Sequence, residues 1–222
     1  MKYKGIIFDF NGVILWDTKW HEESWFLTAK EAGFPLTHQQ IENNHGKLGM
    51  EIFRELLGPS ATSNEIAHWT YRKEEIYREI ALSQGELFTL SPGCRILFDL
   101  LKSENIPRTI ATASEKVNLD FFIKNLKLDQ WFDIGKIIYD DGSLPGKPSP
   151  VMYLKASAEL GFNPKDCIVV EDSRMGLASA FNAQIGKIIA LGPKEKEEEL
   201  TETPGVDRVI HQLDEITLKD FM

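Results

Sequence analysis

The chain has 222 residues, of which 42% are hydrophobic and 27% are charged, enough to bury the core of a globular protein. Its formal net charge of -9 argues against general nucleic-acid binding, because phosphate backbones attract surfaces that are rich in Lys and Arg. No apolar run approaches the roughly 20 residues that cross a bilayer, so we expect a soluble, cytoplasmic protein without membrane contact.

A short apolar strand is predicted at residues 3–9; it ends on Asp9 and runs into the turn signal Asn11-Gly12. The carboxyl end of such a strand is where α/β sheets place their ligands. The next stretch contains no convincing strand. It shows amphipathic helical periodicity instead, at residues 22–32, 50–57 and 65–82. We therefore predict a helical insertion that forms a cap over the carboxyl edge of the sheet.

Strand and helix patterns alternate in the remainder of the chain. Apolar strands that end in small or acidic residues are predicted at 108–114, 166–172 and 187–192. Helical periodicity is found at residues 95–103, 151–160 and 175–182. This alternation predicts a parallel, doubly wound sheet. The predicted fold is α/β, with a Rossmann-like core domain of residues 1–15 and 89–222 and an inserted helical cap domain of residues 16–88.

Charged and hydroxyl side chains are expected at four strand ends: Asp9, Thr112, Lys147, and the pair Glu171-Asp172. Because the carboxyl ends of parallel strands meet at one edge of a sheet, we expect these residues to share a pocket. Each has an ordinary explanation when taken alone, as a turn residue, a strand hydroxyl, a solvated loop lysine or an acidic helix start. Their combination is what indicates an active site.

Four segments, residues 8–13, Thr112, residues 146–148 and residues 171–173, resemble in order and spacing the four motifs of the haloacid dehalogenase (HAD) superfamily. The helical insertion after the first motif resembles the cap of its β-phosphoglucomutase and phosphatase branch. The resemblance covers essentially the whole chain. It implies a Mg²⁺-dependent hydrolase of a small phosphomonoester that forms an aspartyl-phosphate on its first aspartate.

The resemblance also implies a role for each motif residue, and the chemistry of the side chains agrees. Asp9 is the candidate nucleophile, since a carboxylate can attack phosphorus and split one displacement into two easier ones. Oxygen ligands suit Mg²⁺. The expected ligands are Asp9, Asp172 and the backbone carbonyl of Asn11, while Glu171 binds the ion directly or through a water. Lys147 is expected to neutralise charge on the transferring phosphoryl group.

Further residues are expected to contact the substrate. The Thr112 hydroxyl and the Ala113 N–H are expected to hold phosphoryl oxygens. His21 either contacts the substrate or orients the linker into the insertion, and we favour the second role. Lys73 resembles a cap lysine that reads the substrate in this branch, although its charged surroundings at residues 72–75 are typical of a solvated face. The full set predicted to bind substrate is Gly12, Ala113, Ser114, His21, Gly46, Lys47 and Lys73.

The sequence departs from this branch at position 11, where a second aspartate is usual and this chain has Asn11. That aspartate normally protonates the leaving oxygen and then deprotonates the attacking water, whereas Asn cannot shuttle a proton. General acid–base catalysis is typically worth ~10²–10⁴-fold, so we expect slow turnover with metal binding retained, and an increase of roughly ten-fold or more in Asn11→Asp. Asn11 nevertheless belongs to the predicted catalytic group, with Asp9, Thr112 and Lys147.

Two further departures concern the insertion. Trp16 stands where an aspartate is usual, with Asp17 shifted by one, so the hinge beside the site is expected to be arranged differently. Gly49 stands where the mutases carry an arginine that grips a second phosphate, and Lys47 could supply only a point charge there. Hydrolysis is therefore favoured over a β-phosphoglucomutase-like phosphotransfer, which stays an alternative.

A rival interpretation from another class is a phosphometabolite-binding or regulatory protein that does not turn over, in which Asn11 marks lost hydrolysis. Phosphonoacetaldehyde hydrolases and haloacid dehalogenases also lack the second aspartate, but we rank both lower. Gly49 stands at the position that we match to the Schiff-base lysine of the former, and the latter need no metal pair such as Glu171-Asp172. We favour the phosphatase because its chemical groups are all present, and we expect a monomer, with oligomerisation left open.

Overall fold

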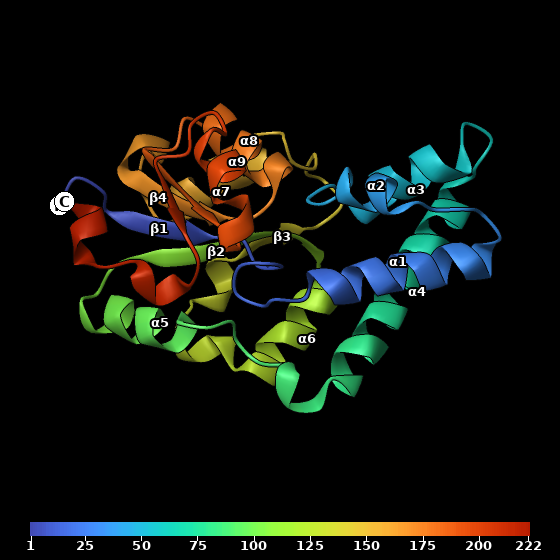
Figure 1. The fold of residues 1–222 in the computed structure, drawn as a ribbon, viewed down its shortest axis with the longest axis horizontal. Coiled ribbons are helices and arrows are strands. Elements are labelled where there is room, and N and C mark those ends of the chain that lie inside the picture. Colours follow the sequence, from blue (N-terminus) through green and yellow to red (C-terminus); the bar gives the residue numbers. More distant parts are fainter.

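A six-stranded parallel sheet forms the centre of the computed structural model, which describes residues 1–222 (Figure 1). The strand order is β3-β2-β1-β4-β5-β6, so the chain winds outward on one side of β1 before it crosses to the other side. Such a reversal is where open α/β sheets bind ligands, beyond the carboxyl ends of the strands. The strands are β1 Gly5–Phe8, β2 Arg108–Glu115, β3 Ile138–Asp140, β4 Cys167–Glu171, β5 Lys187–Leu191 and β6 Arg208–Ile210.

The two central strands, β1 and β4, are buried along their whole length. Their continuous apolar sequences are typical of parallel strands that are covered on both faces. Ile7 pairs with Val169, and Phe8 pairs with Val170. The first pair packs into the cluster of buried side chains on one face of the sheet, and the second pair packs into the larger cluster on the other face. This alternation fixes the register in which β1 and β4 deliver their next residues to the carboxyl edge.

Helices cover both faces of the sheet and make a three-layer core (Figure 1). Buried side chains of α5 and α6 join the larger cluster, whereas those of α7, α8 and α9 join the smaller one. The predicted parallel, doubly wound sheet is confirmed. The helices of the core are α5 Cys94–Ser103, α6 Lys116–Leu126, α7 Val151–Glu159, α8 Arg174–Asn182 and α9 Glu197–Thr201.

Four helices and no strand separate β1 from α5, and Figure 1 shows them beyond the end of the sheet to which β1 points. They have an apolar cluster of their own, which includes Trp25, Phe53 and Ile66. This placement is what a cap requires, and the division into core and cap domains at residues 15 and 89 stays a prediction. No helix in the chain combines the length and apolar character needed to span a bilayer. The four helices are α1 Thr18–Ala32, α2 His38–Glu42, α3 Gly49–Leu57 and α4 Ser63–Ser83.

Candidate active site

The loop after β1 carries Asp9 to the carboxyl edge of the sheet. The Asp9 N–H still donates to the Val170 carbonyl at 3.0 Å, so the pairing of β1 with β4 fixes the backbone of Asp9. The chain then turns at Gly12, which has φ +85° and lies so close to β4 that a Cβ there would sit 2.0 Å from Asp172 Oδ2. A side chain at position 12 would therefore collide with Asp172, and glycine also accommodates the positive φ.

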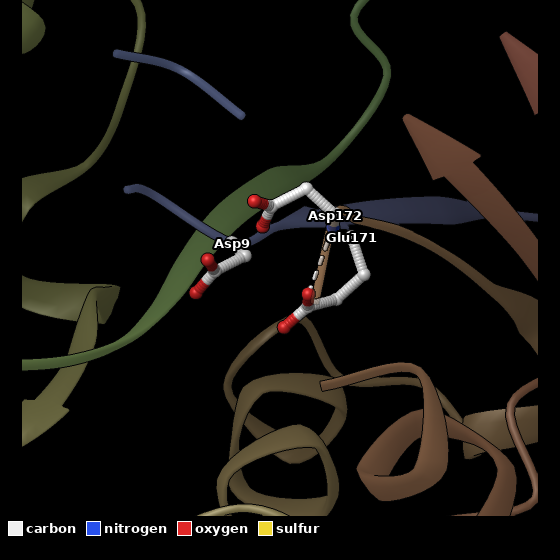
Figure 2. A group of neighbouring side chains, drawn as sticks. All are labelled: Asp9, Glu171 and Asp172. Carbon is white, nitrogen blue, oxygen red and sulfur yellow. Dashed lines mark hydrogen bonds between the residues drawn. The ribbon is translucent and has the colours of Figure 1, made fainter. Parts of the chain in front are cut away.

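Three carboxylates meet where β1 and β4 end (Figure 2). Asp9, Glu171 and Asp172 each place an oxygen within 4.8 Å of the others. Figure 2 shows that Glu171 turns back toward the chain, with its Oε2 accepting a hydrogen bond of 2.9 Å from the Asp172 N–H. The sequence prediction that these acids gather at one edge agrees with this geometry.

Lys147 lies in the loop between β3 and α7, away from a strand end, and its side chain is 1% exposed. Its Nζ donates to Asp9 Oδ1 and to Glu171 Oε1, each at 2.6 Å. Lys147 is therefore no solvated loop lysine; it bridges the carboxylates of two strands. Such a buried, doubly paired ammonium places a fixed positive charge beside the candidate nucleophile.

Glu171 is fully buried and its carboxylate is already saturated with hydrogen bonds. Besides Lys147, Oε1 accepts a hydrogen bond of 2.8 Å from the hydroxyl of Tyr153 on α7. Oε2 accepts from the N–H groups of Asp172 and Ser173, both at 2.9 Å, and from the Ser173 hydroxyl at 3.1 Å. Sequence reasoning missed Tyr153, which holds the carboxylate that in turn holds Lys147.

The charges of this cluster do not balance. Burial raises the pKa of Asp9 to about 7, although Lys147 opposes this shift. Burial, together with the charges of Glu171 and Asp9, raises the pKa of Asp172 well above its ordinary value. Burial alone would lower the pKa of Lys147, but the two carboxylates that it contacts raise it. One ammonium thus faces three acids, and crowding of like charges adds to burial in keeping the pKa values of the two aspartates high.

A cation fits this site on structural grounds. Asp172 Oδ1 is buried and has no hydrogen-bond partner, which is costly for a carboxylate oxygen unless an ion binds it. Hard oxygen ligands on one or two carboxylates are what Mg²⁺ uses in proteins. Asp9 and Asp172 offer such oxygens, whereas the lone pairs of Glu171 are taken by the protein.

The end of β2 brings hydroxyl groups to the same place. Thr112 is 1% exposed, and its Oγ1 accepts the Ser114 N–H at 3.1 Å, which leaves the hydroxyl proton available to a ligand. The Ser114 hydroxyl donates to Asn11 Oδ1 at 2.8 Å. Thr112, Ala113 and Ser114 line a cavity of about 120 Å³ together with Asp9.

Asn11 is held by a residue that the sequence analysis did not place in the site. Its Nδ2 donates to Asp17 Oδ2 at 2.7 Å. Asp17 is fully buried and also accepts from the Gly12 N–H at 3.2 Å and from the hydroxyl of Tyr77 on α4. The shifted aspartate at the hinge is therefore a direct partner of Asn11.

Two residues of the insertion meet at the other side of this network. Lys73 is 3% exposed, so the expectation that it lies on a solvated helix face is wrong. Its Nζ contacts His21 Nδ1 at 2.8 Å and Glu74 Oε1 at 2.9 Å, and it lies over the rings of Trp25 and Tyr77. Since Lys73 can only donate, His21 Nδ1 accepts and its Nε2 carries the proton, 3.3 Å from Asp17 Oδ2.

The first turn of α3 and the loop before it contact the core beside Lys147. Glu51 Oε1 accepts the Gly146 N–H at 3.2 Å, and Leu48 packs in a small apolar cluster with Leu144 and Met152 of the core. Lys47 is paired with Glu55 at 3.2 Å. The insertion thus reaches the loop that carries the bridging lysine, through residues that sequence reasoning did not single out.

The structure brings most of the predicted site residues to the 120 Å³ cavity. Gly12 lies instead on a neighbouring cavity of about 810 Å³, which shares Thr18, His45, Asp172 and Ser173 with the first. Glu171 is fully buried and lines neither cavity. The predicted residues that line the smaller cavity are Asp9, Asn11, His21, Gly46, Lys47, Lys73, Thr112, Ala113, Ser114, Lys147 and Asp172.

Residues 3–184 match the family model described as haloacid dehalogenase-like hydrolase. The chain belongs to this family. A crystal structure of a HAD hydrolase of family IA, variant 3, from Entamoeba histolytica superposes on this HAD-like hydrolase with a TM-score of 0.87 and 34% identity, covering 98% of this chain and 97% of that one. The resemblance seen in the motifs is confirmed, and so is the HAD-like α/β fold.

Curated relatives extend the comparison. Protein CbbY of Rhodobacter capsulatus is 31% identical over 202 residues, which cover 88% of this chain and 87% of that protein. The chloroplastic 5-amino-6-(5-phospho-D-ribitylamino)uracil phosphatase of Arabidopsis thaliana is 25% identical over 98% of this chain, which spans only 56% of that protein. Other relatives include phosphatases and a β-phosphoglucomutase, so the chain is a HAD-like hydrolase of the phosphatase and phosphomutase type. Enzymes of this family generally use Mg²⁺, and the acidic cluster could hold such an ion through the oxygens of Asp9 and Asp172.

Proposed function

We propose that this HAD-like hydrolase is a Mg²⁺-dependent phosphatase that hydrolyses a small phosphomonoester through an aspartyl-phosphate on Asp9. The observation that carries the proposal is the convergence of Asp9, Thr112, Lys147 and Asp172 on one cavity from four separate segments of the chain. The names of several relatives, which describe phosphatases of small phosphorylated compounds, support the same reaction class.

In the proposed reaction a carboxylate oxygen of Asp9 attacks phosphorus, the ester P–O bond breaks, and its electron pair leaves on the alcohol oxygen. Water then attacks the aspartyl-phosphate, which releases phosphate and restores the carboxylate. Lys147, 2.6 Å from Asp9 Oδ1, holds the nucleophile and offers positive charge beside the transferring group. The Thr112 hydroxyl and the Ala113 N–H are the donors that we assign to the phosphoryl oxygens.

We assign the metal to Asp9, Asp172 and the backbone carbonyl of Asn11. A bound Mg²⁺ would supply counter-charge to the phosphoryl oxygens. The unpartnered Oδ1 of Asp172 supports this assignment. Glu171 has a different role in the proposal, because its oxygens are occupied: it holds Lys147 and the backbone of residues 172–173 in place.

The reaction lacks a protein acid at position 11, where the amide of Asn11 cannot give or take a proton. The leaving oxygen must then take its proton from water. Esters of acidic alcohols, which leave readily as anions, are therefore the substrates that we expect the chain to hydrolyse fastest. Alkyl phosphates should turn over more slowly, by roughly the ~10²–10⁴-fold that general acid–base catalysis supplies.

The test uses para-nitrophenyl phosphate with Mg²⁺ and again after chelation with EDTA. We expect turnover that requires the ion and is abolished in Asp9→Asn. Asp141→Asn, which changes an exposed carboxylate bonded only within its own turn, is the matched control and should keep the wild-type rate. Intact mass must show that Asn11 is still an amide, since deamidation would place a carboxylate at position 11. Turnover that survives Asp9→Asn would overturn the proposal.

A second candidate function is a phosphate-binding or regulatory protein, and Asn11 is the observation that favours it. The assay described above distinguishes this function from a phosphatase. A stoichiometric acyl-phosphate on Asp9 without turnover would support the phosphate-binding or regulatory function. A phosphomutase is disfavoured, because Lys47 is already paired with Glu55 and Gly49 offers no cation for a second phosphate.

A further inference from the structure

The side chain of Asn11 is fixed at both ends. Its Nδ2 donates to Asp17 Oδ2 at 2.7 Å, and its Oδ1 accepts from the Ser114 hydroxyl at 2.8 Å. The two partners leave only one orientation of the amide, because a carboxylate can accept but not donate. An amide in this orientation is held by Asp17 and Ser114, and its remaining N–H hydrogen and oxygen lone pair can contact a ligand but cannot transfer a proton to a leaving group.

The Asp17 carboxylate accepts hydrogen bonds on both oxygens and has no exposed surface. Oδ1 accepts the Gly12 N–H at 3.2 Å, and Oδ2 accepts both Asn11 and the hydroxyl of Tyr77. Burial and the charge of Asp17 raise the pKa of Tyr77 well above its ordinary value, so this phenol stays a donor. Each of these three partners thus presents a proton to Asp17, which is the arrangement that a buried carboxylate requires.

We propose that Asp17 is a positioning residue that requires an amide at position 11, and that the pair Asn11–Asp17 together sets the hydrolytic rate of this chain. An aspartate at position 11 would face Asp17 across 2.7 Å in a buried place, where two ionised carboxylates repel each other and a shared proton would tie the new acid to Asp17. The rate increase that the sequence alone predicts for Asn11→Asp is therefore not expected, because Asp17 would displace the new carboxylate.

The geometry favours a swap that restores the contact. In the double variant Asn11→Asp/Asp17→Asn, the amide at position 17 has two hydrogens, one for the carboxylate at position 11 and one for the Tyr77 oxygen, while the Tyr77 hydroxyl proton loses its acceptor at position 17. Its carbonyl oxygen still accepts the Gly12 N–H. The hydrogen bond between positions 11 and 17 is kept with its direction reversed, and a single carboxylate now stands at position 11. Asp17→Asn alone fails in either orientation of the new amide, because its NH2 group then faces either Asn11 Nδ2 or the Gly12 N–H, and both are donors.

The pair also connects the nucleophile loop to the insertion. Asn11 follows β1, whereas Asp17 precedes α1 and contacts Tyr77 on α4. His21 on α1 lies beside the same pair, with its Nε2 3.3 Å from Asp17 Oδ2 but without a hydrogen bond to it. A mismatch at position 11 is therefore expected to loosen the contact between the loop and both long helices, which a thermal unfolding measurement detects.

The experiment compares the wild type with Asn11→Asp, Asp17→Asn and the double variant, by thermal unfolding and by hydrolysis of an aryl and an alkyl phosphate. We expect each single variant to lose several degrees in Tm, and the double variant to return to within about 2 °C of the wild type. On the alkyl phosphate, which depends most on a protein acid, the double variant should be roughly ten-fold or more faster than Asn11→Asp. Asn11→Ala, which adds no charge, should stay slow.

Two results would overturn the inference: additive losses of Tm in the double variant, or an Asn11→Asp variant that is as stable as the wild type and as fast as the double variant. The rate comparison rests on the proposed function, whereas the Tm comparison does not. If no protein of the set hydrolyses either ester while the Tm pattern holds, the proposed function and the claim about rate fail together and the pairing stands.

Discussion

Removal of the Tyr153 hydroxyl tests how far the hydrogen bond from Tyr153 to Glu171 matters for the position of Lys147. The phenol oxygen lies 2.8 Å from Glu171 Oε1, and both side chains are fully buried. Tyr153→Phe keeps the aromatic ring, over which Lys147 Nζ lies at 5.3 Å, so the packing of the lysine is preserved. Only the hydrogen bond is lost, and water cannot readily replace it because both side chains are fully buried.

A hydrogen bond to a charged group is worth about 1.5–3 kcal/mol, and here its partner stays buried when the donor is removed. We therefore expect Tyr153→Phe to cost about 2 kcal/mol of unfolding free energy. In a chain of this length each 1 kcal/mol corresponds to roughly 2–4 °C in Tm, so the midpoint should fall by roughly 4–8 °C. Because Glu171 then holds Lys147 less firmly, kcat for an aryl phosphate should fall as well.

Thermal unfolding and steady-state kinetics with Mg²⁺ measure the two effects. Tyr71→Phe removes the hydroxyl of a half-exposed tyrosine and is the matched control, with no change expected. The reasoning is refuted if Tyr153→Phe unfolds and turns over as the wild type does. A loss of stability with unchanged kcat would limit Tyr153 to a role in folding and separate Glu171 from the action of Lys147.

Three further predictions concern contacts outside the acidic cluster. Glu51→Gln weakens the contact with the Gly146 N–H and should lower kcat/KM by roughly five-fold, about 1 kcal/mol, with little change in Tm; an unchanged rate would show that this contact does not matter for turnover. Lys73→Met removes the ion pair of the mostly buried Glu74 carboxylate, which keeps only its hydrogen bond from Asn118, and should cost roughly 3 kcal/mol in denaturant unfolding. Lys116→Met on the exposed face of α6 should cost less than about 1 kcal/mol, and equal losses would contradict the burial argument. Burial would raise the pKa of Asp220, but its hydrogen bonds with Lys187, Arg208 and a backbone N–H lower it. Asp220 therefore stabilises the folded protein fully above its pKa in the unfolded chain, about 4, and this stabilisation is lost as the pH falls through its lower pKa in the folded protein. Asp220→Asn should therefore destabilise at about pH 7 and progressively less below about pH 4, and a loss that does not depend on pH would refute this assignment.

The central strands could be predicted from the sequence because burial on both faces leaves a continuous apolar run in β1 and β4. The edge strands β3 and β6 were missed, since each has three residues and neither is fully buried. Helix α6 was missed for another reason. Phe121, Phe122 and Ile123 are consecutive apolar residues, so its pattern does not reduce to a single stripe.

The convergence of the motif residues was predictable because parallel strands point their carboxyl ends to one edge, and the meeting of Asp9, Thr112 and Asp172 followed from that rule. Lys147 was also expected at a strand end, but it lies in the loop between β3 and α7, which carries no regular pattern, and only the resemblance indicated its role. The structure adds the reason why a lone lysine can be buried there: it pairs with carboxylates from the ends of β1 and β4.

Partners supplied by distant helices were beyond sequence reasoning. Lys73 lies in a charged run that is typical of a solvated face, yet α1 covers it with His21 and Trp25. The local sequence indicates only that Asp17 precedes a helix and that Tyr153 occupies an apolar position of α7. Their roles depend on which side chains the fold brings to them, and a single sequence does not contain that information.

The central claim is that Asp9, Asp172 and Lys147 act on one phosphoryl group around one divalent ion. A crystal structure of the chain with Mg²⁺ and beryllium fluoride, which mimics a phosphoryl group on a carboxylate, tests it directly. The account predicts the fluoride adduct on Asp9, with Asp172 as a ligand of the ion and Lys147 Nζ against the adduct. An ion bound away from Asp172, or an adduct on another residue, would contradict it.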